Sequence, residues 1–192
     1  MRARSLLTAV LALTLGATAA VAAGHPEVVG AVGTTTAVDG ALNSGGASVA
    51  LSLLWPLEER FRFGVMGFAD DLGQQRTQLV APDGTPLGPI PGYHRATLAA
   101  VWRLEAHPSV GGAWDPYASA TWGMYRLSDD LHGDATRTLG SAGFGLGLGC
   151  ARRIATTHAA GLAVRYQWLM RGDTGKYLSA ALEWRWRPGA TE

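Results

Sequence analysis

Charged side chains recur inside stretches of the chain that are otherwise apolar, and these are the residues whose types and spacing could do chemistry. Arginine pairs with carboxylates through two parallel hydrogen bonds, while a ring of like charges selects ions in a pore. Because an unpaired buried charge is costly, we expect a paired network that fills an interior space. The predicted members are Arg62, Asp70, Arg95, Arg103, Glu105, Arg165, Glu183 and Arg185. Within this network we expect Arg165 and Glu183 to pair.

A histidine and a serine with catalytic potential stand close together in His107-Pro108-Ser109. A histidine that activates a serine needs a third, orienting group. The proline indicates a turn, and no glutamate is expected at matching depth, so we interpret the segment as a turn. The other histidines, His25, His94, His132 and His158, lack metal-ligand spacing. We therefore predict no catalytic, metal-binding or cofactor-binding residues.

Composition narrows the remaining function classes. The 192 residues carry a formal net charge of +1, and 16% of them are charged, so no strong field favours nucleic acid. The single cysteine, Cys150, excludes an intramolecular disulfide and a multi-cysteine metal site.

The beginning of the chain has the pattern of an export signal. Arg2 and Arg4 precede an uncharged apolar run over 6–20, and Val21-Ala22-Ala23 supplies small residues for cleavage. The predicted organisation is a cleaved signal peptide over 1–23, one folded unit over 24–188 and a short tail over 189–192.

The elements that must position the charged residues are β-strands, because apolar and polar residues alternate with period two. In the last such stretch, Leu178, Ala180, Leu182, Trp184 and Trp186 alternate with Ser179, Ala181, Glu183, Arg185 and Arg187. Such segments occur at about 27–38, 46–56, 60–70, 93–105, 115–127, 139–150, 158–170 and 176–187. Their lengths suit tilted membrane-spanning strands.

Apolar side chains share one face of these strands with aromatic rings, while arginine and glutamate occupy the other. A soluble barrel with this pattern would bury charges or expose a wide apolar surface, whereas lipid outside the barrel removes the conflict. The prediction is an all-β fold, an eight-stranded antiparallel up-and-down transmembrane β-barrel in the bacterial outer membrane. In 143–149 the glycines are expected either to thin the wall so that bulky lumen side chains fit or to permit sharp strand curvature.

Connections and aromatic residues orient the barrel. With the N-terminus in the periplasm, 71–92 and 128–138 become surface loops. Aromatic belts are expected at both membrane interfaces. The periplasmic belt would contain Trp55, Phe61, Trp102, Trp114, Tyr117, Trp184 and Trp186. The outer belt would contain Tyr93, Tyr125, Tyr166, Trp168 and Tyr177.

Three stretches carry a resemblance to a known superfamily: Trp114-Asp115-Pro116-Tyr117 through Gly123, the glycine-rich segment 139–149, and the final arginine- and tryptophan-rich segment. Together they resemble outer-membrane β-barrels of the small OmpA-like and opacity types. Members usually end on an aromatic residue, whereas here Trp186 is followed by Arg-Pro-Gly-Ala-Thr-Glu. Some eight-stranded members are lipid A deacylases that use a His-x-Ser motif in the outer half of a late strand, a position that His107 does not match.

Three functions remain open at this point. The first is a structural or surface-interaction barrel, not an enzyme, with a lumen plugged by arginine–carboxylate pairs. The second is a small porin or transporter for small or apolar solutes, and the third a lipid-modifying barrel enzyme. Expected partners are outer-membrane lipid, the barrel-assembly machinery and a surface ligand at loops 71–92 and 128–138. We expect a monomer without cofactor or nucleic acid.

Overall fold

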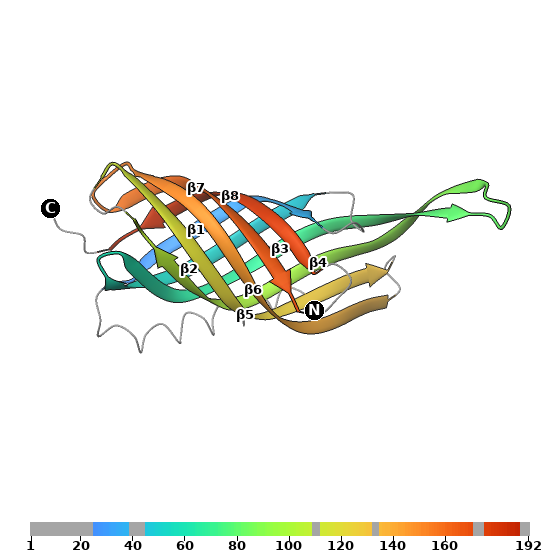
Figure 1. Ribbon diagram of the computed structural model, residues 1–192, viewed down its shortest axis with the longest axis horizontal. Helices are drawn as coiled ribbons and strands as arrows, with labels where there is room; N and C mark the ends of the chain where they lie inside the picture. The colour runs from blue at the N-terminus through green and yellow to red at the C-terminus, as the bar shows by residue number, and fades with distance from the viewer. Residues whose placement is uncertain (1–24, 39–44, 109–111, 132–134, 171–174, 189–192) are drawn as a thin grey trace.

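Eight antiparallel strands close into a barrel in the computed structural model, each strand pairing with the next and β1 with β8 (Figure 1). The structure describes residues 25–38, 45–108, 112–131, 135–170 and 175–188. The strands are β1 (Glu27–Ala37), β2 (Gly46–Glu58), β3 (Phe61–Val80), β4 (Pro86–Ala106), β5 (Trp114–Leu131), β6 (Ala135–Arg153), β7 (His158–Leu169) and β8 (Lys176–Trp186). The predicted fold class is confirmed. Among the described residues there is no helix of sufficient length and hydrophobicity to cross a membrane.

The two ends of the barrel differ. At one end β1 begins and β8 ends, and we call this the terminal end; it lies on the left in Figure 1. At the opposite end, which we call the hairpin end, β3 and β4 continue as a ribbon well beyond the other strands (Figure 1). The predicted signal peptide lies outside the described residues.

The two segments predicted as surface loops are largely strand, which corrects that prediction. In 71–92 the pairing of β3 with β4 continues to Val80 and Pro86, with register shifts near Gly73 and Arg76. The connection itself is a tight turn in which Gly84 adopts a φ of 87° and the Asp83 carboxylate accepts from the Thr85 N–H at 3.0 Å. Likewise, β5 and β6 pair as far as Leu131 and Ala135, within the predicted loop 128–138. Polar composition hid both extensions, and in 71–92 four prolines also argued against strands. A two-stranded ribbon outside the barrel needs no apolar face, so the alternation that marks the other strands is missing.

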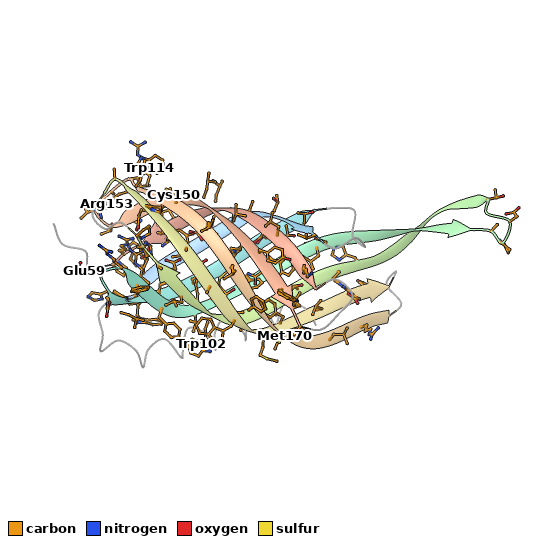
Figure 2. The ribbon with its side chains drawn as sticks, viewed as in Figure 1. Glu59, Trp102, Trp114, Cys150, Arg153 and Met170 are labelled. Carbon is orange, nitrogen blue, oxygen red and sulfur yellow. The ribbon has the colours of Figure 1, made fainter. Side chains whose placement is uncertain are left out.

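Burial follows the alternation along β8. Leu182 and Trp184 are 64% and 49% exposed, whereas Glu183 and Arg185 are 3% and 0% exposed. The alternating positions with apolar side chains therefore face outward, and those with charged side chains face the lumen, as predicted. Trp102 and Met170 project from the outer wall in Figure 2.

The glycines of β6 give lumen side chains room. A Cβ added to Gly149 would lie 2.2 Å from Cζ of Tyr117, and one added to Gly145 would lie 2.3 Å from Oε1 of Gln167. Neither position accepts a side chain while its neighbour keeps its place. The predicted thinning of the wall is confirmed.

Candidate functional site

Ionisable side chains gather inside the barrel at its terminal end, where nitrogen and oxygen atoms crowd together in Figure 2. They come from the ends of β1, β3, β4, β5 and β8 and from the residues that directly follow β4 and β8. Strand alternation places them on the inner face. We call them the charge cluster: Glu27, Arg62, Arg103, Glu105, His107, Asp115, Glu183, Arg185 and Arg187.

Arg185 is the centre of the charge cluster. Its Nη1 donates to Oε2 of Glu105 and its Nη2 to Oε1 of the same carboxylate, both at 3.0 Å. The guanidinium also donates to Glu183 at 3.1 Å and to Glu27 at 3.3 Å. With no exposed surface, Arg185 is held by three carboxylates.

Arg103 and Tyr117 extend this centre. Arg103 pairs with Glu105 and, at 3.2 Å, with Glu183. The Tyr117 hydroxyl donates to Glu183, and the Tyr117 ring lies 4.2 Å from Cζ of Arg185. A guanidinium over an aromatic face is stabilised by the ring quadrupole, so the tyrosine supports both charges.

The contacts of Arg185 cross the lumen. Arg103 and Glu105 belong to β4, Glu183 and Arg185 to β8, and three strands separate β4 from β8 in either direction around the barrel. Residues on opposite walls therefore meet at 3.0–3.2 Å. An eight-stranded barrel is just wide enough for its side chains to fill, and these pairs occupy its lumen at this level.

A second layer covers the centre toward the terminal end. Arg62 pairs with Glu27 at 3.0 Å and with Asp115 at 3.3 Å, and Arg187 reaches the same two carboxylates at 3.1 and 3.0 Å. The His107 ring joins the layers, since Nδ1 lies 2.6 Å from Asp115 and Nε2 lies 3.1 Å from Glu105. Burial opposes protonation of this imidazole, but the hydrogen bonds to both carboxylates outweigh it and raise the pKa of His107 above its usual value.

Carboxylates and guanidiniums are equal in number in the charge cluster. Four carboxylates, Glu27, Glu105, Asp115 and Glu183, face four guanidiniums, Arg62, Arg103, Arg185 and Arg187. Buried ions persist when each is paired and hydrogen-bonded, whereas removal of one partner leaves an uncompensated charge. The cluster is therefore expected to act as one unit.

The hairpin half of the lumen holds separate, smaller groups. Ser48 donates to Asp70 at 2.5 Å, and the Tyr125 hydroxyl donates to Gln167 at 2.7 Å. Arg95 makes two hydrogen bonds to Asp129, at 2.6 and 2.9 Å. None of these contacts is an ion pair with the charge cluster. Met66 lies between the two halves, because its Sδ accepts from Arg165 at 3.4 Å and from Arg103 of the cluster at 3.9 Å.

All eight residues of the predicted network face inward, but the structure divides them. Arg62, Arg103, Glu105, Glu183 and Arg185 meet in the charge cluster, whereas Asp70, Arg95 and Arg165 lie in the hairpin half. The predicted pairing of Arg165 with Glu183 is wrong. The register of β7 and β8 places Arg165 opposite Ser179, four residues from Glu183 along β8.

Sequence reasoning missed Glu27, His107, Asp115 and Arg187. Two of these had a usable signal, because His107 and Arg187 each stand two residues after a predicted lumen residue and share its face. The expectation that no glutamate lies near His107 is wrong, since Glu105 contacts its ring. Ser109 lies outside the described residues.

The aromatic belts need correction at three positions. Tyr117, Tyr125 and Tyr177 are at most 3% exposed and face the lumen. These tyrosines alternate in step with Ser119, Thr121 and Ser179, which are buried polar residues, so the sequence pattern already indicated that they face inward. Outward exposure of 41–57% is found at Phe61, Trp102, Trp114, Trp168, Trp184 and Trp186, and Trp122 joins them unpredicted. Trp55 and Tyr166 are partly exposed, and the Tyr93 side chain is not among those described.

No acidic, histidine or cysteine side chains gather into a metal-binding group of three or more in the part of the chain that the structure describes. The contacts of the charge cluster are ion pairs and hydrogen bonds, and some of them join opposite walls of the lumen.

Comparisons with known proteins place the fold. No protein-family model matches the chain, and neither does any curated protein. Neisserial surface protein A is similar in structure, with a TM-score of 0.60, 14% identity, and coverage of 85% of this chain and 96% of that one. The outer membrane protein OprG of Pseudomonas aeruginosa matches with a TM-score of 0.55 and 12% identity, over 85% of this chain and 93% of OprG. The N-terminal barrel of OprF from the same organism matches with a TM-score of 0.54 and 11% identity, over 85% of this chain and 98% of that barrel. At these identities the likeness shows the fold alone, the eight-stranded barrel that this chain shares with these small outer-membrane proteins.

Proposed function

We propose that the protein is an outer-membrane barrel with a structural or surface-interaction role, whose lumen is closed by the charge cluster. The observation that carries this proposal is the set of ion pairs between opposite walls, in which Arg103, Glu105, Glu183 and Arg185 are each at most 3% exposed. A conducting pathway would require these pairs to separate and their charges to be rehydrated, which is costly for paired buried ions.

The terminal end faces the periplasm in this proposal, and the β3–β4 ribbon stands at the cell surface. Even strand number with both termini at one end is the usual arrangement of bacterial outer-membrane barrels, with longer connections outside. The ribbon is the longest extension of the barrel (Figure 1), and it supplies the surface for interaction. Among the structural neighbours, the attachment invasion locus protein of Yersinia pestis, with a TM-score of 0.50 and 11% identity, is named for attachment.

His107 supports a non-enzymatic role. A histidine that acts as general base toward serine needs a ring nitrogen within hydrogen-bond reach of the hydroxyl. Here Nδ1 contacts Asp115 and Nε2 contacts Glu105, so both ring nitrogens already have carboxylate partners. The ring therefore serves the charge cluster.

Two measurements test the proposal. Liposomes that contain the refolded protein should swell in a small sugar no faster than protein-free liposomes, and rapid swelling would contradict the closed lumen.

Orientation is tested with single cysteines in a Cys150→Ser background. Asp83→Cys, in the ribbon turn, should react with a membrane-impermeant maleimide on intact cells, whereas Glu59→Cys, in an exposed turn at the terminal end, should not. The reverse labelling pattern would contradict the orientation.

A further inference from the structure

The outer wall of the barrel is hollowed over β2 to β6. This hollow, which we call the outer groove, has a volume of about 650 Å³ and an almost entirely apolar lining. Small-molecule sites typically occupy about 300–1,000 Å³. The outer groove is therefore large enough to accommodate a ligand segment and not only a single methyl group.

Strand register explains the shape of the outer groove. Leu51 of β2, Gly67 of β3, Ala100 of β4 and Met124 of β5 are successive cross-strand partners on the outward face. The two small residues form the floor, and the two long side chains, 44% and 63% exposed, form its sides. The trough therefore follows β3 and β4.

Of the described residues that line the trough, only Arg126 carries a positive charge, and it lies on the side of the hairpin end. Arg126, exposed on the outer face of β5, is the cross-strand partner of Leu98 and Gly140. Among the described residues no carboxylate forms an ion pair with Arg126, in contrast to the arginines of the charge cluster. A Cβ added to its cross-strand partner Gly140 would meet no atom within 4 Å, so the outer face of β6 next to Arg126 is open.

We propose that the outer groove binds one acyl chain of a phosphorylated anionic lipid, with the lipid phosphate paired to Arg126. An apolar trough with a cation at one end matches a chain that carries its charge at one end, and arginine is well suited to phosphate. On the proposed orientation this lipid belongs to the outer leaflet. The inference requires the membrane location but not a closed lumen, so either can fail without the other.

The test is lipid binding to the delipidated, detergent-purified full-length protein, followed by native mass spectrometry. The probes are dimyristoyl phosphatidylglycerol and the zwitterionic phosphatidylcholine with the same chains. The wild type should retain one phosphatidylglycerol in preference to phosphatidylcholine. Arg126→Gln should lower the affinity for phosphatidylglycerol about fivefold, the effect of one basic residue at a lipid surface. Arg153→Gln, which removes an exposed arginine at the last position of β6, outside the outer groove, is the matched control and should change nothing.

A second pair of variants tests the trough itself. Ala100→Leu adds a side chain to the exposed floor and should weaken binding of both lipids, whereas Ala180→Leu, at an exposed outward position of β8, should not. Equal wild-type affinity for the two lipids, or wild-type binding by Ala100→Leu, would overturn the proposal. So would a protein dimer that Ala100→Leu dissociates, because the occupant would then be a second copy of the chain.

Discussion

Removal of Glu105 is expected to be among the most damaging single changes in the lumen. Its carboxylate accepts two hydrogen bonds of 3.0 Å from Arg185, pairs with Arg103 and contacts His107. Glu105→Ala leaves three carboxylates against four guanidiniums in the charge cluster. Because Arg103 and Arg185 are 1% and 0% exposed, water cannot compensate them, and we expect a loss of about 3–5 kcal/mol in the free energy of unfolding.

A double-mutant cycle measures how strongly Glu105 and Arg185 depend on each other. Arg185→Ala should also be destabilising by about 3–5 kcal/mol. The double variant restores three carboxylates against three guanidiniums, so its loss should fall short of the sum by about 2–3 kcal/mol, at the upper end of the coupling range for contacting residues. Arg95, ten residues from Glu105 on β4 and paired with Asp129, provides the control, and Arg95→Ala with Glu105→Ala should be additive within about 0.5 kcal/mol.

The assay is reversible guanidinium unfolding from lipid vesicles, followed by tryptophan fluorescence and extrapolated linearly to zero denaturant. Strict additivity of Glu105→Ala and Arg185→Ala would refute the reasoning, because it would mean that the two side chains do not depend on each other.

Three further predictions concern the wall, the glycine strand and pH. Leu182→Arg should lower the unfolding free energy in vesicles by about 2–4 kcal/mol, as charges do on a lipid-facing strand, while the lumen-facing Ala181→Ser should have little effect; equal tolerance would refute the assigned faces. Gly149→Ala should lower the melting temperature in detergent and lose about 1–3 kcal/mol through its clash with Tyr117, whereas Gly140→Ala, which adds a Cβ in open space, should be nearly neutral. Because the folded-state pKa of His107 is raised, its contribution to stability is complete below about pH 6.5 and lost as pH rises through the folded pKa. The melting temperature should therefore depend less on pH across this range in His107→Gln than in the wild type, whereas His158→Gln should keep the wild-type dependence. An unchanged pH dependence in His107→Gln would exclude this contribution.

Much of the fold could be predicted from alternation alone, because lipid outside and charge inside force a strict two-residue period. That period gave the eight strands and the inward parity of Arg103, Glu183 and Arg185. The two-residue period could not predict the β3–β4 ribbon beyond Gly73. This ribbon lies outside the barrel and has no side toward the lumen, so its residues need not alternate. Parity also places Tyr117 inside, but its apparent depth near a membrane interface suggested a belt position.

Contacts across the lumen could not be predicted, because they depend on register and closure. Pairing of Arg185 with Glu105 requires β4 and β8 to lie opposite each other, which follows only once β1 pairs with β8. Pairing of Arg165 with Glu183 was inferred from a hairpin whose centre the sequence does not define, and the observed register rejects it. Sequence thus identified most members of the charge cluster but not its partnerships.

Conductance in planar lipid bilayers tests the closed lumen most directly. The refolded wild type should leave the bilayer current at its protein-free level across the applied voltages, because ion pairs at 3.0–3.2 Å join opposite walls of the barrel. Large, steady unitary currents from the wild type would show that the charge cluster does not close the lumen, and the protein would then be a porin.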